Sequence, residues 1–364
     1  MIRFIKWLFA GMLSLVCTIL GVSYFINYHP SKTENIAVDG EGGSLLSRNQ
    51  SIKILNWNVQ YMAGKNYVFY YDLPDGSGPD TTPSLEDMGT TMEGVAQVIR
   101  EEAPDIILLQ EVDIDSKHTH YVNEFESIKK LLPESYKYSA FAYYHKSLFV
   151  PHPKIMGRVG MGLCVISKYP ISKAIRHQLP QLKMDPFSKM FFLKRCVLEC
   201  HIPYAEGGEM VVLNTHPEAF SKGSDIMQQQ MNVIAGILED LDHQNTPWII
   251  GGDFNLLPPG QKALLPEKST YFWYSPQSEL KTLTNRWSSI PTLEEATGAN
   301  MADWFTHFPN NPVIDHPDRT LDYFFYSPLF KKEKHFVRSR DTLTLSDHLP
   351  VISTFSPINS TYKF

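Results

Sequence analysis

The chain has 364 residues, of which 43% are hydrophobic, 20% charged and 12% aromatic. This length and composition suit one large globular domain or two small ones, and they exclude an intrinsically disordered chain. The formal net charge of -6 argues against a protein that holds duplex nucleic acid through a broad basic face. The four cysteines lack the spacing of a metal site and decide little about the compartment.

The N-terminal segment is long and apolar enough to cross a membrane. Arg3 and Lys6 precede an uncharged run, Trp7–Ile26, and twenty helical residues span about 30 Å, the thickness of a bilayer core. Because the positive residues come first, residues 1–28 predict a single-pass anchor that leaves the rest of the chain on the non-cytoplasmic side. The alternative is a cleaved signal peptide and a secreted protein, although no convincing cleavage site follows the run.

The chain then changes in character twice. Residues 29–50 contain glycines, serines and scattered charges without an apolar period, which predicts a linker. From Ser51 onwards, a pattern typical of one folded domain continues to about residue 358. Ile52–Val59 is a predicted strand, and a helix is predicted after the capping-box pair Ser84 and Asp87.

The remaining elements indicate the fold class. Further strands are predicted at 106–110, 162–167, 191–202, 209–215, 248–251, 321–326 and 349–355, with a helix at 226–241. Helices lie between strands early and late in this domain, and hairpins dominate its middle. This order favours an α/β architecture with mixed or antiparallel sheets over a doubly wound parallel fold.

Polar residues gather at the ends of these predicted strands. The residues at or just after a strand end are Asn58, Glu111, His216 and Asp253; those at or just before a strand start are Asp322, Asp347 and His348. In antiparallel neighbours, the end of one strand lies beside the start of the next, so these side chains are expected to meet along one edge. Burying such a cluster without a purpose would be costly.

These residue types suit the hydrolysis of phosphate esters. A hard cation such as Mg²⁺, which Mn²⁺ could replace, binds oxygen ligands of the kind that Glu111 and Asn58 offer. Asp253 could orient or deprotonate the attacking water. His216, His348 and Asn255 could donate hydrogen bonds to phosphate oxygens, and Asp322 could fix the tautomer of an imidazole.

Six short segments strengthen this interpretation. They are LNWNV (55–59), LLQEVD (108–113), NTH (214–216), GGDFN (251–255), LDYFF (321–325) and SDHLPV (346–351). Together with GLCVISKYPI (162–171), they resemble the ordered signature of the endonuclease/exonuclease/phosphatase superfamily, over about residues 51–355. The resemblance implies a four-layer α/β sandwich, in which two packed sheets lie between helices, and a catalytic domain at 51–358.

The resemblance also implies roles for single residues. Glu111 matches the principal metal ligand, Asn58 an asparagine that supports metal and phosphate, and Asp347 a second metal ligand. Asp253 and Asn255 match the pair that aligns the attacking water and the phosphate.

Asp322 matches the aspartate that pairs with the last histidine, which is His348. His216 matches a histidine of the deoxyribonuclease and sphingomyelinase branches that the abasic-site endonuclease branch lacks. One departure is Pro217, where an apolar residue is commoner. Outside the signature, Arg195 is interpreted as a solvated or salt-bridged strand residue, with a phosphate contact as the alternative.

Three functions are compatible with these residues. The first is a membrane-anchored phosphodiesterase or phosphatase for a lipid headgroup or small phosphoester, which the anchor and the acidic charge favour. The second is an exported nuclease acting on nucleic acid. The third is a non-catalytic binding module, disfavoured because every expected catalytic position is filled. We expect a monomer, and the spacing leaves open whether one or two metal ions bind.

Overall fold

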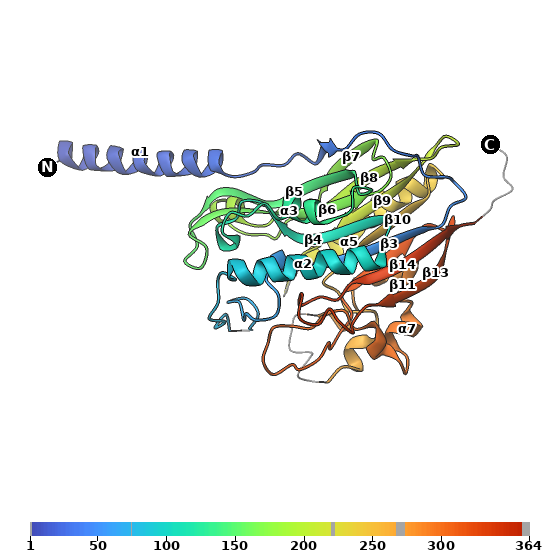
Figure 1. The fold of residues 1–364 in the computed structure, drawn as a ribbon. Coiled ribbons are helices and arrows are strands. Elements are labelled where there is room, and N and C mark those ends of the chain that lie inside the picture. Colours follow the sequence, from blue (N-terminus) through green and yellow to red (C-terminus); the bar gives the residue numbers. More distant parts are fainter. Residues whose placement is uncertain (1, 74, 220–222, 267–273, 359–364) are drawn as a thin grey trace.

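The computed structural model describes residues 2–73, 75–219, 223–266 and 274–358. Two seven-stranded sheets pack face to face, with helices on their outer sides (Figure 1). This confirms the predicted α/β sandwich. The apolar core between the sheets includes Leu108 from one sheet and Leu198 from the other, both fully buried.

The first sheet has the strand order β13-β14-β3-β4-β6-β5-β2. Its strands are β2 (Val38–Asp39), β3 (Ile52–Asn58), β4 (Ile106–Asp113), β5 (Tyr138–Val150), β6 (Gly157–Ser167), β13 (Phe330–Val337) and β14 (Val351–Pro357). β3 and β4 are parallel, and the other pairs are antiparallel. Ile106–Leu109 is buried on both faces, between the core and α2, as its continuous apolar run predicts.

The second sheet has the strand order β1-β7-β8-β9-β10-β12-β11. Its strands are β1 (Thr33–Ile36), β7 (Lys173–Gln178), β8 (Cys196–Pro203), β9 (Glu209–Thr215), β10 (Trp248–Asp253), β11 (Ser288–Ile290) and β12 (Asp322–Tyr326). β9 and β10 are the parallel pair, connected through α5 (Ile226–His243). The apolar face of α5 packs on the outer side of this sheet, against Val211 and Leu213.

The other helices lie on the outer side of the first sheet, within the connecting loops and at the N-terminus. They are α1 (Ile2–Ile26), α2 (Leu85–Glu102), α3 (Glu124–Leu131), α4 (Pro186–Phe191), α6 (Lys281–Thr284) and α7 (Leu293–Thr297), with 3-10 turns η1 (Gln60–Met62), η2 (Lys117–Thr119), η3 (Gln261–Ala263) and η5 (Met301–Trp304). α2 begins where its capping residues predict, because Ser84 Oγ accepts a hydrogen bond from Asp87 N at 3.0 Å. α1 projects from the body and has the length and hydropathy of a membrane span.

The segment predicted as a linker, residues 29–50, differs from that expectation. Thr33–Ile36 pairs with β7 and Val38–Asp39 pairs with β5, so one short segment adds an edge strand to each sheet. Leu46 is also buried in the core between the sheets. The unpaired backbone groups of two sheet edges explain this docking, because the segment satisfies their hydrogen bonds.

The strand predicted at 191–202 is shorter than expected, because a short helix ends at Phe191 and irregular chain follows up to Arg195. Asp185 is the N-cap of α4, where the extended chain before the helix ends. Its carboxylate accepts hydrogen bonds from Phe187 N and Ser188 N, both at 3.0 Å. Pro186 then starts α4, where its missing N–H is no disadvantage. β8 begins only at Cys196.

A buried polar network joins the two sheets beneath one edge of the sandwich. Gln110 Nε2 donates to Asn56 Oδ1 at 2.9 Å within the first sheet and to Asn214 Oδ1 of the second at 2.7 Å. Asn214 Nδ2 donates in turn to Leu109 O and Cys164 O, both at 2.9 Å. These bonds fix the position of one sheet relative to the other.

We predict that Asn214→Ala destabilises the domain by about 2–4 kcal/mol, because it leaves two carbonyl groups and one amide donor buried without partners. Urea unfolding of the two proteins measures the difference. Asn300→Ala is the matched control, since Asn300 is exposed and its side chain caps nothing. Equal stability of the two variants would contradict the role given to the network.

Candidate active site

The polar strand ends meet at one edge shared by both sheets. Asn58, Glu111 and the Asp347–His348 pair come from the first sheet, and His216, Asp253 and Asp322 from the second. The register explains this meeting, because Asp253 at the end of β10 lies directly opposite Asp322 at the start of β12. The structure thus brings together all the residues that the sequence predicts for the site.

His348 and Asp322 form the central pair of the site. His348 Nδ1 lies 2.7 Å from Asp322 Oδ2, and both side chains are buried. His348 Nε2 points the other way and lies 3.5 Å from Asp253 Oδ2. Burial lowers the pKa of His348, but Asp322, Asp253 and Asp347 outweigh it, so the pKa of His348 is raised well above its ordinary value. The imidazole is therefore held as a charged hydrogen-bond donor.

Asn58 connects the carboxylates of the two sheets. Its Nδ2 donates to Glu111 Oε1 at 3.2 Å and to Asp253 Oδ2 at 3.1 Å. Its Oδ1 accepts from Gln60 N at 3.0 Å, so this oxygen is already engaged. The geometry suits an amide that positions two carboxylates better than the direct metal ligand that the sequence predicts.

Glu111 occupies an unusual backbone conformation. Its φ is 57°, the left-handed region, and the pairing of β4 with β6 shifts register between Leu109 and Val112. A bulge at this position turns the Glu111 side chain into the site, at an expected cost of about 1–3 kcal/mol. Burial, with the nearby Asp347, raises the pKa of Glu111 to about 8.

Asp253 lies between the two histidines. Its Oδ2 is 3.4 Å from His216 Nε2, and its Oδ1 accepts from Asn255 N at 2.9 Å. Burial raises the pKa of Asp253 to about 6, and His348 opposes this shift. Burial, then the positive charges of Arg195 and His348, lower the pKa of His216 well below its ordinary value, so His216 is neutral.

A left-handed backbone conformation places the side chain of Asn255. Its φ of 53° lies in the left-handed region, which asparagine tolerates better than most residues. Its Nδ2 lies 3.3 Å from Pro217 O, so the residue after the NTH segment supports the amide that the GGDFN segment supplies.

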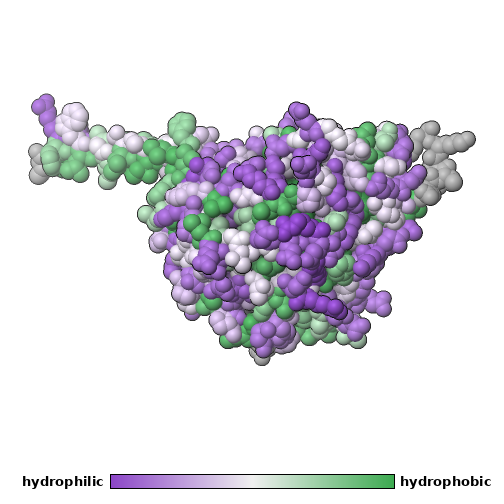
Figure 2. Space-filling model, in the orientation of Figure 1, coloured by the Kyte–Doolittle hydropathy of each residue, from purple (hydrophilic) through white to green (hydrophobic). Residues whose placement is uncertain are grey.

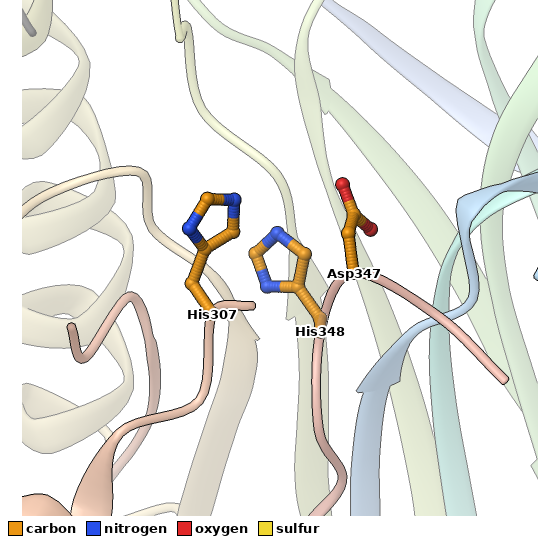
Figure 3. Close-up of side chains that lie close together, drawn as sticks. All are labelled: His307, Asp347 and His348. Carbon is orange, nitrogen blue, oxygen red and sulfur yellow. The ribbon is translucent and has the colours of Figure 1, made fainter. Parts of the chain in front are cut away.

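A third histidine, which the sequence did not predict, joins Asp347 and His348. One donor atom from each of His307, Asp347 and His348 lies within 4.8 Å of the others, an arrangement that could hold a metal ion. Figure 3 shows His348 between His307 and Asp347, with the His307 and His348 rings adjacent. The ring centroids are 4.8 Å apart. Burial lowers the pKa of His307 well below its ordinary value, which favours a neutral imidazole of the kind that can bind a metal.

The donor set and the charge of the site suit a divalent cation. Burial raises the pKa values of Glu111, Asp253 and Asp347, because the site concentrates carboxylates away from water. A bound cation would relieve this repulsion. Carboxylate oxygens and neutral imidazoles are donors that Mg²⁺ and Mn²⁺ accept.

The site opens into a cavity of about 930 Å³. Its lining includes the polar groups of the site and aromatic side chains, among them Tyr71, Phe187 and Phe191. The aromatic loop before α2 contributes in two ways: Tyr61 and Phe69 pack in a small buried cluster, and Tyr70 and Tyr71 line the cavity with them.

Arg195 belongs to this cavity, so its interpretation as a solvated or salt-bridged strand residue was wrong. It is 5% exposed, and its guanidinium carbon lies 5.0 Å from the ring centre of Tyr144. Its Nε and Nη1 have no hydrogen-bond partner within the described residues. A buried guanidinium with free donors beside carboxylates and histidines is suited to an anionic ligand.

These features lie at one edge of a two-sheet sandwich, and the comparisons identify its family. The model of the endonuclease/exonuclease/phosphatase family matches residues 55–348, and the chain belongs to this family. A search of the curated proteins finds no significant match.

Solved structures share the fold at low sequence identity. An endonuclease/exonuclease/phosphatase from Beutenbergia cavernae is 20% identical, with a TM-score of 0.58 over 85% of this chain and 72% of that one. The human Nocturnin catalytic domain with bound sulfate is 16% identical, with a TM-score of 0.53 over 89% and 98%. A mannosyl-6-phosphatase from Bacteroides thetaiotaomicron is 16% identical, with a TM-score of 0.51 over 84% and 99%.

We predict that Arg195→Met weakens the binding of inorganic phosphate by about tenfold to a hundredfold, because it removes charged donors from a buried site. Calorimetric titration with phosphate in the presence of Mg²⁺ measures the change. Arg100→Met is the control, since Arg100 is exposed on α2 and pairs with Glu93 and with the carbonyl of Leu131 at the end of α3. Unchanged phosphate affinity in Arg195→Met would reject this role.

Proposed function

We propose that this protein is a divalent-metal-dependent phosphoesterase that hydrolyses phosphodiester or phosphomonoester bonds. The observation that carries the proposal is the His348–Asp322 pair, which faces Asp253 in a buried cavity that also holds Glu111 and Arg195. Such an arrangement supplies a water-orienting carboxylate, charged donors and a cation site within reach of one phosphate group.

Glu111, Asp347 and His307 are the residues that would hold the metal. Mg²⁺ is the proposed ion, and Mn²⁺ could replace it. When bound, the ion would supply positive charge to the phosphate oxygens and relieve the carboxylate repulsion described above. Asn58 would keep Glu111 and Asp253 oriented through the two hydrogen bonds of its amide.

The other side chains of the site would align the attacking water and bind the phosphate. Asp253 would accept a hydrogen bond from the attacking water and align it. His348, charged and held by Asp322, would donate to a non-bridging phosphate oxygen, where negative charge grows during attack. His216 and Asn255 border the same space and would position the phosphate, with Arg195 as an additional cationic donor.

The proposed substrate is a lipid headgroup or a small phosphoester. The net charge of -6 supports this choice over nucleic acid, which calls for a basic groove. We further propose that α1 remains as a single-pass anchor and that the domain acts, as a monomer, on the non-cytoplasmic side. The positive residues before α1 support this orientation, and a secreted form is the alternative.

The water-orienting role predicts a large effect of Asp253→Asn. We expect the turnover number to fall by about 10²–10⁴-fold, because the amide cannot accept a proton. The fold should be retained, since asparagine has the same shape and its oxygen can still accept the hydrogen bond of Asn255 N. Steady-state hydrolysis of a soluble aryl phosphoester measures turnover, and circular dichroism checks the fold.

The matched control is Asp240→Asn, which makes the same chemical change on the exposed side of α5. Turnover near the wild-type value in Asp253→Asn would contradict the role of Asp253. A loss of similar size in Asp240→Asn would show that the assay reports stability instead of chemistry.

A further inference from the structure

We propose that the wall of the active-site cavity next to α1 enters the membrane surface, and that the substrate is a phospholipid drawn from the leaflet in which α1 ends. This inference rests on the proposed function and names its substrate class. The wall consists of α4 and of the tip of the β5–β6 hairpin, residues 148–156, of which Leu148 and Phe149 lie on the outer side and do not line the cavity.

The C-terminal end of α1 is docked rigidly on the domain. Asn27 forms an antiparallel bridge with Ser147 of β5, and Tyr28 N donates to Lys146 O at 3.2 Å. Ser23 and Asn27 are buried, although most of α1 is exposed. β1 follows within a few residues and pairs with β7. No flexible tether therefore separates the helix from the cavity, and the orientation of the helix fixes that of the cavity.

A continuous apolar surface connects α1 to the cavity. A pocket lies between residues 18–26 of α1 and the wall, where Phe149, Pro151, Phe187 and Phe191 face the helix. Of these, Pro151, Phe187 and Phe191 also line the active-site cavity. Figure 2 shows the apolar residues along α1 and where α1 meets the body. An acyl chain could follow this surface from the helix toward the catalytic groups.

The depth of this contact fits the boundary between headgroups and acyl chains. Ile19 and Val22 face the wall, and at 1.5 Å per residue they lie about 10 Å and about 6 Å below Ile26, where the uncharged span ends. Elements that rest in a membrane surface bury their apolar face by about 5–10 Å. The wall would therefore reach the acyl region while the catalytic groups remain near the phosphate level.

The exposed residues of the hairpin tip support the same placement. Leu148 is 60% exposed and Met156 49%, which is unusual for large apolar side chains unless a surface covers them. Lys146 and Lys154 are exposed beside them, where their charges would meet phosphate headgroups. In Figure 1 the hairpin lies on the side of the body from which α1 projects.

The first experiment measures contact with the bilayer in full-length protein reconstituted in phosphatidylcholine vesicles. Cys17→Ala removes the exposed cysteine and leaves three buried ones. Leu148→Cys in this background is labelled with bimane, and quenching by acyl-chain nitroxide lipids is recorded. The matched control is Leu293→Cys on α7, away from α1 in Figure 1. We expect quenching at 148 only; equal quenching at both positions, or none at 148, would overturn the proposed placement.

The second experiment tests the substrate with the double variant Leu148→Glu/Phe149→Glu, whose altered residues lie outside the active-site cavity. We expect hydrolysis of vesicle phospholipid to fall about tenfold, because charges at the tip oppose its insertion. Hydrolysis of a soluble aryl phosphoester by the same preparation should not change. Leu293→Glu should change neither rate.

The outcomes separate this inference from the proposed function. Equal losses on both substrates, or unchanged lipid hydrolysis, would overturn the inference. Hydrolysis of the soluble ester without hydrolysis of phosphatidylcholine, phosphatidylethanolamine or phosphatidylglycerol would overturn the substrate class alone. Failure to hydrolyse any ester would instead contradict the proposed function, and the quenching result would still decide where the wall lies.

Discussion

The hydrogen bond between His348 and Asp322 is the contact on which the site depends. It joins His348, which lies just before β14 of one sheet, to Asp322, the first residue of β12 of the other. Asp322 is fully buried, and His348 is 4% exposed and lines the cavity. The polar network of Gln110 and Asn214 lies beneath it and holds the sheets in the relative position that the bond needs. The sandwich therefore acts as the frame that aligns two independent strand edges.

The charges gathered at this edge of the sandwich indicate that the site is built for a ligand. Four carboxylates share a buried edge with one charged histidine and one arginine, and burial raises the pKa of three of them. Without a cation, this arrangement is repulsive, and part of the domain's folding free energy must oppose it. The left-handed backbone of Glu111 adds strain at the same place. Strain and repulsion concentrated at one cavity are features of sites built for a ligand.

The sequence predicts much of this site because its signals are local. Asn58, Asp253 and His348 each follow or precede a short apolar run, and strand ends of one sheet edge must come together in any such fold. The capping residue Ser84 likewise marks the start of α2 correctly. Both inferences require only the spacing of apolar residues along the chain and the identity of the residues next to each apolar run.

Other parts of the site depend on contacts that no local pattern reveals. His307 lies in an irregular segment, and backbone pairing with both Arg319 and His348 brings it beside Asp347. Arg195 immediately precedes β8, and whether its side chain ends in solvent or in a cavity depends on Tyr144 from the other sheet. The strands in residues 29–50 are too short to alternate, and they form because two sheet edges are available.

The most direct test of the account is the metal dependence of hydrolysis by the full-length protein in detergent micelles. A soluble aryl phosphodiester, its monoester, phosphatidylcholine and plasmid DNA would be assayed in parallel with Mg²⁺, and again after EDTA. The account predicts hydrolysis of an ester or the lipid that EDTA abolishes and Mg²⁺ restores, with DNA left intact. Hydrolysis that persists in EDTA, or DNA cleavage at a comparable rate, would contradict it.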